Sequence, residues 1–432
     1  MTAPRSADVV VVGSGITGAA TAAALAERGA TVLVLDKEHG PAREGSGRAQ
    51  GSLRVQGRHP SEFPLVVEAL RLWGRGAAED PAHDAEFSTN GNVYLCTSED
   101  ERPLLLELAA QARAAGLVDV RYLEADGVRE IVPAAAGPLL GGMWSPYDAQ
   151  AQPDKGTHLF VRRAERAGVR FGFDTLVTRI LTDGGRVMGV DTDRGQVHAP
   201  SVVVAAGVWT AHLLAEVGVR VPLMPVCLSE VETAPLPPLF RPTVRAFGFG
   251  ARQRPDGRLV VSAGLGARVT RRASFYDVNG LRFWLPRAKA FRKNLRIRVD
   301  ARQVWRELRH RRSLGAGLVP VPSPEPVVDR RSVDDALHLL AQVFPAAGDA
   351  VAQRYWAGLV DMTPDGLPVI DHLAGQDGLV VVAGLCGHGL ALGPVLGEIA
   401  ADLALDGTTQ HLIAPFSLAR FAGKVASPEV MI

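Results

Sequence analysis

Three runs of apolar residues, each leading into glycine and then a helix-forming stretch, stand out along the chain. They lie at 9–12, 202–204 and 379–383. Short β-branched runs without alternation are typical of strands buried on both faces of a parallel sheet. The stretches at 19–27 and 394–405 have helical composition, and the second has proline in its first turn and glycine after its end. The pattern predicts α/β structure in three separate parts of the chain.

A different pattern occupies the chain from about Val221 to Phe344. It has many prolines and short alternating strands such as 258–263. Strict alternation of apolar and polar residues indicates strands with one buried and one polar face. We therefore expect an antiparallel sheet in this region.

Three glycines at GxGxxG spacing follow the first apolar run: Gly13, Gly15 and Gly18. In such a unit the first glycine permits a tight turn, the second lets a pyrophosphate approach, and the third lets the helix pack on the strand. The pyrophosphate binds at the helix N-terminus, where unpaired N–H groups favour an anion. Asp36 ends the next strand about 20 residues further on, where a carboxylate binds a ribose diol. The sequence predicts a dinucleotide-binding unit.

The spacing of the α/β segments bears on which dinucleotide is bound. A nicotinamide dehydrogenase usually keeps its nucleotide-binding fold contiguous, and a disulfide-reductase-type flavoprotein would have a second GxGxxG unit. Gly264-Leu265-Gly266 lacks the third glycine and the helix. The layout therefore favours FAD. The predicted fold class is α/β, with a Rossmann-like FAD-binding domain of the GR2 type built from residues 1–80, 151–215 and 351–432, and an antiparallel-sheet α+β substrate domain built from residues 81–150 and 216–350.

Composition sets the remaining bounds. A chain of 432 residues with 47% hydrophobic content can form two domains. Its 47 Lys and Arg against 46 Asp and Glu give no overall attraction to nucleic acid or a membrane. Three cysteines without a CxxC pair indicate neither a disulfide framework nor a cysteine metal site, so we expect no metal. No membrane span or signal peptide is expected, and a cytoplasmic location fits.

Residues 282–312 carry a dense set of arginines and lysines. Two interpretations stay open: a solvated face, or a docking surface for an acidic partner or an anionic, carrier-bound substrate. We do not expect nucleic acid to bind, because the region contains no recognised binding module. Trp284, Trp305 and Tyr276 lie among these cations and belong either to the core or to the substrate side.

Several segments together carry a family resemblance. They are the N-terminal unit, the loop at 46–54, the strand at 202–209, the passage at 356–371 and the loop at 384–389. These motifs resemble the D-amino acid oxidase family of FAD oxidoreductases. Within it the chain is most similar to the branch of sarcosine oxidase and the β-subunits of opine oxidases.

The resemblance implies oxidation of a C–N bond. A hydride passes from the carbon bearing the amine to flavin N5, and the resulting imine hydrolyses. The expected substrate is an N-substituted amino acid or a secondary amine. Two alternatives stay open: an FAD-bearing β-subunit that needs a partner subunit or electron acceptor, or a biosynthetic tailoring oxidase that acts on an amine or alcohol of a carbohydrate or natural-product intermediate.

The resemblance also implies roles for particular residues. Arg54 would point to the flavin edge or the substrate, with a structural salt bridge as the alternative. The loop at 387–389 and the helix after it would lie near the flavin pyrimidine, where His388 either assists or bonds only to backbone. The expected catalytic residues are Arg54, His388 and Gln50. The residues expected to bind FAD are Gly13, Gly15, Ile16, Thr17, Gly18, Asp36, Lys37, Ser46, Arg48, Gly51, Ser52, Val177, Ala206, Gly207, Trp209, Gly358, Asp361, Gly387, His388, Gly389, Leu390 and Ala391.

The chain departs from the family pattern where relatives bind the substrate carboxylate. Ala391 stands where sarcosine-oxidase-like members have lysine, and Val360 stands where glycine oxidase and D-amino acid oxidase have arginine. A bulkier N-substituted amino acid, or a substrate without an α-carboxylate, would suit this change. Gly358 occupies the place of the cysteine that attaches flavin covalently, so we expect noncovalent FAD. Cys386 is expected to be a small buried thiol, with a redox or covalent role as the alternative.

Overall fold

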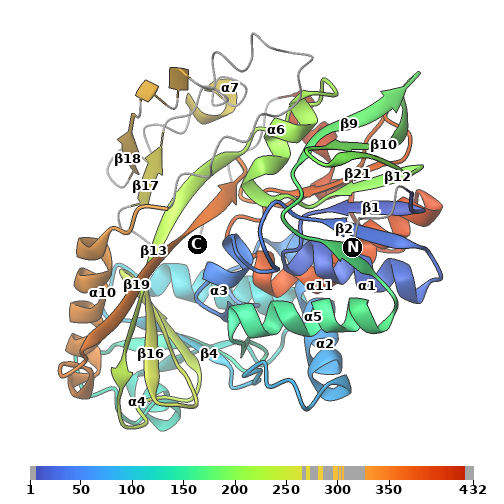
Figure 1. The fold of residues 1–432 in the computed structure, drawn as a ribbon. Helices are drawn as coiled ribbons and strands as arrows, with labels where there is room; N and C mark the ends of the chain where they lie inside the picture. The colour runs from blue at the N-terminus through green and yellow to red at the C-terminus, as the bar shows by residue number, and fades with distance from the viewer. Residues whose placement is uncertain are drawn as a thin grey trace.

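Two sheets organise the chain, as the computed structural model in Figure 1 shows. It describes residues 6–264, 269–272, 281–285, 295–299, 301–302, 304–305 and 326–423. Most of the basic region at 282–312, together with Tyr276 and Leu265-Gly266, lies outside the described residues. The predicted α/β fold class is confirmed.

The smaller main sheet contains the three apolar runs found in the sequence. Its strands, in spatial order, are β20 (Val369–His372), β21 (Leu379–Ala383), β12 (Ser201–Val204), β1 (Val9–Val12), β2 (Val32–Leu35) and β8 (Arg170–Gly172). Neighbours from β21 to β8 run parallel, whereas β20 is antiparallel to β21. Every residue of β1 is buried, as expected for a strand covered on both faces.

Helices cover one face of this parallel sheet and a small second sheet covers the other (Figure 1). The helical layer contains α1 (Ile16–Glu27), α2 (Phe63–Glu79), α5 (Pro153–Arg166) and α11 (Gly389–Asp406). The opposite layer contains β9 (Val177–Asp183), β10 (Arg186–Thr192), β11 (Gly195–His198) and α6 (Thr210–Ala215).

The larger sheet is mostly antiparallel and carries α4 (Ala125–Ile131) and α10 (Arg330–Val343) on one face. Its strands in order are β18 (Leu295–Arg298), β17 (Val269–Arg272), β13 (Met224–Pro235), β16 (Arg258–Ala263), β15 (Phe249–Gln253), β14 (Thr243–Ala246), β4 (Asn92–Cys96), β6 (Gly141–Ser145) and β5 (Arg121–Glu124), with β19 (Ala352–Met362) paired to β13. The remaining elements include α3 (Arg102–Ala114), α7 (Leu281–Trp284) and the short ladder of β3 (Ser52–Leu53) with β7 (Ala149–Gln150). Because β19 belongs to this sheet, residues 352–362 do not pair with the parallel sheet that contains β21.

Helix α11 begins at Gly389, five residues before the start expected at Pro394. A proline inside a helix removes the N–H that would bond the carbonyl four residues earlier. That carbonyl belongs to Leu390, and it accepts a hydrogen bond from Trp73 Nε1 at 3.1 Å instead. The side chain from α2 therefore satisfies the group that proline leaves unpaired, so the helix continues through Pro394.

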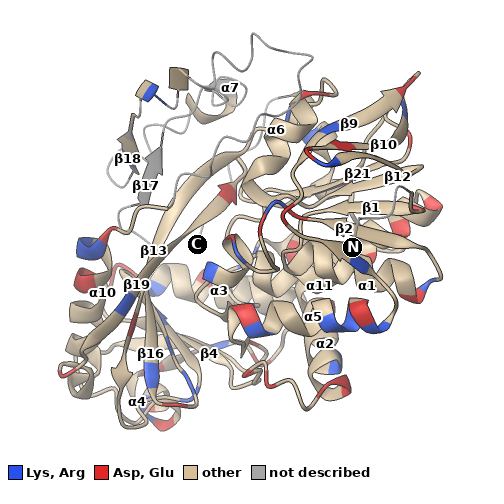
Figure 2. Ribbon diagram, viewed as in Figure 1, with Lys and Arg blue, Asp and Glu red and all other residues tan. Residues whose placement is uncertain are grey.

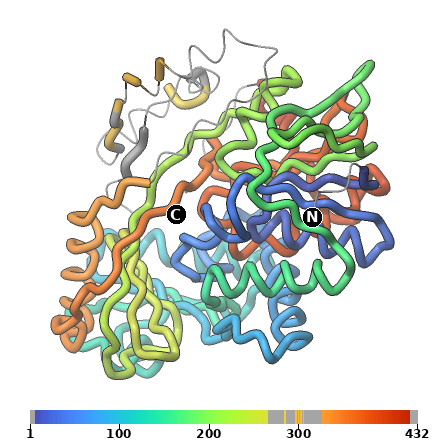
Figure 3. Tube along the Cα trace, in the orientation of Figure 1, coloured from blue at the N-terminus to red at the C-terminus, as the bar shows by residue number. Residues whose placement is uncertain are grey.

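Glycine allows α11 to pack closely against α1, although the two helices lie at opposite ends of the chain (Figure 3). A Cβ at Gly397 would lie 2.6 Å from Ala20 Cβ and 2.7 Å from the Thr21 nitrogen. We expect Gly397→Ala to destabilise the protein by about 1–3 kcal/mol through overpacking. Urea unfolding measures this, with Gly423→Ala as the control because a Cβ there meets nothing within 4 Å. Equal stability of the two variants would contradict the close packing.

Charges of both signs alternate on the outer helices, and Figure 2 shows this along α5. Arg163 of α5 is only 8% exposed in its side chain and donates two hydrogen bonds of 2.6 Å to Glu27 of α1. None of the helices in the described part of the chain combines the length and apolar character needed to cross a membrane.

Candidate active site

The turn between β1 and α1 lies at the carboxyl end of the parallel sheet. Gly13 has φ +105°, and a Cβ there would meet the Ala205 carbonyl group. A Cβ at Gly18 would meet the Gly13 carbonyl oxygen, so this glycine allows the close strand–helix contact. Beside Gly15 lies Ser46, whose Oγ accepts a hydrogen bond from the Ile16 N–H at 3.0 Å.

Asp36 is held at the end of β2 by three donors. Its Oδ2 accepts hydrogen bonds from Ser14 N at 2.7 Å and Ser14 Oγ at 2.6 Å, and its Oδ1 accepts one from Glu38 N at 2.9 Å. Burial raises the pKa of Asp36, although these hydrogen bonds oppose the shift. The next residue, Lys37, lies 5.4 Å from the centroid of the Trp209 ring. The carboxylate is thus fixed where a ribose binds in proteins of this topology.

Unpartnered polar atoms on α1, on β3 and in the turn after β12 fit a polar ligand such as FAD. Thr17 Oγ1, Ser52 Oγ and Trp209 Nε1 are buried without a hydrogen-bond partner among the described residues. Buried polar groups normally have partners, so these atoms are suited to contact a bound polar group or water. Trp209 closes the short turn at Gly207–Trp209 after β12, where Gly207 has φ +53°.

Arg252 of β15 holds the loop that follows the nucleotide unit. Its Nε donates to the Gln50 carbonyl oxygen and its Nη2 donates to Gln152 Oε1 at 2.6 Å. A Cβ at Gly51, which has φ +102°, would lie 2.6 Å from Arg252 Nε. Burial lowers the pKa of Arg252 to about 10. A side chain of the larger sheet thereby positions the loop expected to lie along the flavin.

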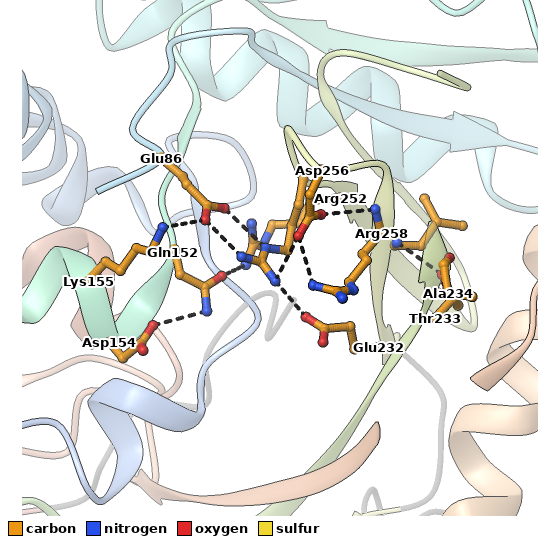
Figure 4. A network of polar contacts seen from close by, with 12 residues as sticks. Glu86, Gln152, Asp154, Lys155, Glu232, Thr233, Ala234, Arg252, Asp256 and Arg258 are labelled. Carbon is orange, nitrogen blue, oxygen red and sulfur yellow. Dashed lines mark hydrogen bonds and ion pairs between the residues drawn. The ribbon is translucent and has the colours of Figure 1, made fainter. Parts of the chain in front are cut away.

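A network of hydrogen bonds and ion pairs beside Arg252 reaches the start of α5 (Figure 4). Arg254 donates to Glu86 at 2.8 Å and to Glu232 at 2.9 Å, and Lys155 donates to Glu86 at 2.8 Å. Burial alone would raise the pKa of Glu86, but Arg254 and Lys155 lower it to about 2. This network connects the larger sheet to α5 beside the parallel sheet.

We expect Arg252→Met to raise the dissociation constant of FAD about tenfold, because a loop held by charged hydrogen bonds loses its orientation. Titration of FAD into the apoprotein measures the effect. The matched control is Arg258→Met on the neighbouring strand, where the arginine is half exposed and pairs with Asp256 at 3.0 Å. Equal FAD affinities for the two variants would remove Arg252 from this role.

Three arginines and a tyrosine converge beyond this loop. Arg54 and Arg58 come from the loop, Arg245 from β14 and Tyr94 from β4, and the Arg245 guanidinium lies 5.1 Å from the Tyr94 ring centroid. Nη1 of each arginine and the Tyr94 hydroxyl are buried without a partner in the described chain. Burial, then Arg245 and Arg58, lower the pKa of Arg54 well below its ordinary value. Arg54 therefore makes no salt bridge within the described residues, and the four groups form a cationic cluster, which we call the guanidinium cluster.

Two buried carboxylates lie close to the guanidinium cluster. Asp148 accepts hydrogen bonds from Val55 N at 3.0 Å and from Ser145 Oγ. Burial raises the pKa of Asp148 to about 6. The other carboxylate is Glu62, which interacts electrostatically with Arg58.

His388 is oriented by Glu62. Its Nδ1 lies 2.9 Å from Glu62 Oε1, so the hydrogen bond of this histidine goes to a side chain rather than to backbone. Burial, and then Arg58, lower the pKa of His388 to about 4. Burial opposes ionisation of Glu62, yet His388 keeps the Glu62 pKa below its ordinary value. The pair is a carboxylate and a neutral imidazole, with Nδ1–H donated to Glu62 and Nε2 left as a hydrogen-bond acceptor.

Asp361 holds the loop before His388 through hydrogen bonds to the loop backbone. Its carboxylate accepts hydrogen bonds from Gly384 N at 2.7 Å and Leu385 N at 3.2 Å. Cys386 has φ +51°, and its Sγ lies 3.2 Å from Thr363 Oγ1. Burial raises the pKa of Cys386 to about 12, so the thiol is neutral.

Five more of the predicted site residues fall into two groups. Arg48 contacts β19, because it accepts a hydrogen bond from Trp356 Nε1 at 3.0 Å and a Cβ at Gly358 would lie 3.1 Å from its own Cβ. The second group is buried in hydrophobic layers: Val177, Leu390 and Ala391. Ala391 is 1% exposed inside the helical layer, and its methyl group offers no carboxylate anchor there.

The sequence did not indicate most of the polar site residues: Arg58, Glu62, Tyr94, Asp148, Arg245 and Arg252. Arg58 and Glu62 follow Arg54 within one loop, so the polarity of that loop was a usable signal. Tyr94, Arg245 and Arg252 alternate with apolar residues on strands, where a polar side chain normally faces water. Nothing in their own segments indicates that this face is covered.

The sequence relatives cover nearly the whole chain. Glycine oxidase from Geobacillus kaustophilus is 28% identical over 428 residues, covering 97% of this chain and 98% of the relative. N-methyl-L-tryptophan oxidase from Salmonella arizonae is 26% identical, covering 96% of this chain and 99% of the relative.

Solved structures give the same picture. L-amino acid deaminase from Proteus myxofaciens, solved in complex with anthranilate, superposes with a TM-score of 0.88 at 25% identity, covering 98% of this chain and 95% of that one. The sequence profile of the DAO family, described as FAD dependent oxidoreductase, matches residues 8–403. The chain therefore belongs to the DAO family of FAD-dependent oxidoreductases, which confirms the family and the cofactor expected from the sequence.

Proposed function

We propose that this enzyme oxidises the C–N bond of an N-substituted amino acid whose carboxylate binds in the guanidinium cluster. The observation that carries the proposal is the set of buried, unpartnered donors on Arg54, Arg58, Arg245 and Tyr94. FAD, when bound, accepts the hydride from the substrate carbon. The residues of this chain bind and orient the substrate and control its proton.

The charge of the guanidinium cluster favours an anionic ligand. Its three guanidinium groups are accompanied by two carboxylates, Asp148 and Glu62, so one positive charge is in excess. A buried charge is costly unless it is paired. Arginine binds carboxylates with two parallel hydrogen bonds, so a substrate carboxylate would supply both the missing charge and the missing acceptors.

This cluster would replace the anchors that the chain lacks at Val360 and Ala391. It favours a substrate that carries a carboxylate over a plain amine. It also weighs against an alcohol of a carbohydrate, because a neutral hydroxyl would leave the excess charge unpaired. Anthranilate, the ligand of the structurally similar deaminase from Proteus myxofaciens, is itself a carboxylate.

His388 has the geometry to act on the substrate nitrogen. Its Nε2 makes no hydrogen bond within the described residues, and Glu62 fixes the ring from the other side. Release of a hydride from carbon requires the nitrogen lone pair, so the amine has to be neutral. We assign His388 Nε2 as the acceptor for the N–H of the substrate. A carboxylate bound beside Arg54 and Arg58 would weaken their repulsion of a protonated imidazole and so favour proton acceptance.

Anaerobic mixing of the holoenzyme with substrates tests the proposal. The panel contains N-methyl amino acids, opines and D-amino acids, together with the corresponding decarboxylated amines and amino sugars. We expect the absorbance of oxidised flavin to bleach with N-substituted amino acids and not with their decarboxylated counterparts. Bleaching by amines or amino sugars alone would overturn the proposal. Full occupancy by FAD with no bleaching by any compound would favour a partner-dependent subunit.

A further inference from the structure

A single row of residues crosses the larger sheet on the face turned away from α4 and α10. Strand pairing places Tyr94 opposite Arg245, Arg245 opposite Gly250, Gly250 opposite Ser262, Ser262 opposite Glu230, and Glu230 opposite Trp356. Directly paired residues of adjacent strands share a face. The guanidinium cluster therefore stands at one end of a row whose other end contains Glu230.

The row lies against the loop at 46–58. A Cβ at Gly250 would lie 3.3 Å from Gln50 Nε2, and Trp356 donates a hydrogen bond to the Arg48 carbonyl oxygen. Arg245 interacts electrostatically with Arg54. Residues along the whole row thus interact with the loop at 46–58, which the family resemblance places along the flavin. Both ends of the row belong to the same candidate site.

Glu230 lacks the partners that a buried carboxyl group needs. The residue is 5% exposed, and its Oε2 has no hydrogen-bond partner in the described chain. Arg252 is the charged group that acts on it, but the Arg252 guanidinium bonds to the Gln50 carbonyl oxygen and to Gln152. Burial raises the pKa of Glu230 to about 8. Its neighbours in the row, Ser262 and Trp356, are neutral.

Glu232 shows the contrast on the same strand. Two residues along and on the same face, it bonds to Arg254 at 2.9 Å (Figure 4). The structural acid on this face, Glu232, therefore has a cationic partner. Glu230 contacts no cation among the described residues. An unpartnered buried carboxyl in a candidate binding site indicates a ligand group that completes it.

We propose that Glu230 binds a positively charged group at the far end of the substrate, so that the preferred substrate is an amino acid with a second, cationic terminus. The inference rests on the proposed function for the anionic end only. Three inter-strand steps of roughly 4.8 Å separate Arg245 from Glu230, or about 14 Å between backbones. The Arg245 and Glu230 side chains reduce the distance between their charged groups. The remaining distance fits a small extended molecule with a carboxylate at one end and an ammonium group at the other.

Binding of ω-amino carboxylates to the holoenzyme tests Glu230 independently of turnover. Isothermal titration calorimetry compares 5-aminopentanoate through 8-aminooctanoate with the alkanoates of equal chain length. We expect the best ω-amino carboxylate to bind at least about tenfold more tightly than its alkanoate, as for a hydrogen bond between charged groups. The preference should grow as the pH rises through about 8, because the ammonium group binds the ionised Glu230 carboxylate.

Two variants make the test specific. Glu230→Gln should remove the preference while alkanoate affinity stays within about twofold. Glu232→Gln, which makes the same change in charge two residues away, should retain it. Glu230→Asp withdraws the carboxyl by one methylene and should move the preferred ligand to a chain one carbon longer. Because Glu230→Asp retains a carboxyl group, it keeps the test usable if Glu230→Gln no longer binds FAD.

The outcomes separate the two proposals. Equal binding of ω-amino carboxylates and alkanoates by the wild-type enzyme overturns the assignment of Glu230 but leaves the carboxylate site intact. A preference that survives in Glu230→Gln has the same consequence. If no carboxylate of either series binds, the guanidinium cluster is not an anion site and the proposed function fails first.

Discussion

Replacing Arg245 with methionine is expected to weaken carboxylate binding about 30-fold to about 150-fold. Arg245 offers a buried Nη1 without a partner in the described chain, and the loss of a hydrogen bond to a charged group costs about 2–3 kcal/mol. Calorimetric titration of hexanoate into the holoenzyme measures the change. In flavin reduction by a substrate, the concentration for half-maximal rate should rise far more than the limiting rate falls.

The stability of this variant gives a second readout that a structural arginine would not show. Burial lowers the pKa of Arg245, which means that its charge is unfavourable in the ligand-free protein. Its removal also relieves repulsion of Arg54. We therefore expect Arg245→Met to unfold at an equal or higher urea concentration than the wild type.

Arg254→Met is the matched control for that stability test. Arg254 is 13% exposed in its side chain but pairs with Glu86 and Glu232, so its loss leaves two acids short of a partner. Breaking such pairs typically costs about 3–5 kcal/mol. Loss of stability in Arg245→Met as large as in Arg254→Met, with hexanoate affinity unchanged, would show that Arg245 is structural.

Replacing His388 with asparagine is expected to slow flavin reduction at saturating substrate by about 100-fold or more, as for loss of a proton acceptor. Asparagine suits this position because His388 occupies the N-cap position of α11, where its own side chain makes no capping hydrogen bond and asparagine is favourable. FAD content and hexanoate affinity should stay close to wild type. Glu62→Gln keeps the imidazole but loses its carboxylate partner, so we expect a smaller loss of about tenfold.

The lowered pKa of His388 also predicts how the rate of flavin reduction depends on pH. The pKa of His388 is lowered to about 4, so the imidazole stays neutral across the range from about pH 6 to pH 7, where an ordinary histidine titrates. The rate constant for reduction at low substrate concentration, which reports the groups of the free enzyme, should therefore show no break from His388 in that range. A wild-type break near pH 6.5 that disappears in His388→Asn would contradict the lowered pKa. An unchanged rate in His388→Asn would remove the residue from the reaction.

Local signals predicted the nucleotide-binding unit in detail. The valine run at 9–12 forms β1 with the expected bounds. Gly13 and Gly18 lie so close to neighbouring carbonyl groups that only a residue without a side chain fits. The Asp36 carboxylate ends the second strand as expected. These features were accessible because their causes act over a few residues: burial on both faces selects β-branched residues, and tight turns select glycine.

The start of α11 was predicted wrongly for a reason that lies outside its own segment. Proline is read as a helix start, since the first turn lacks intrahelical N–H partners anyway. Here the carbonyl that Pro394 leaves free bonds to Trp73, a residue of another helix. No rule that considers only neighbours in the sequence can supply that partner.

The fold class, the dinucleotide turn and the family, and with the family the cofactor, could be predicted from the sequence alone. Each depends on periodicity, glycine spacing or motif order. The tertiary contacts were needed to show that Arg54 meets Arg245 and Tyr94, that Glu62 orients His388, and that Glu230 lies in the same row. The physical reason is that a charge costs little on a solvated strand face and much when another part of the chain covers it. Which charges are buried together, and which lack a partner, follows from how the two sheets meet.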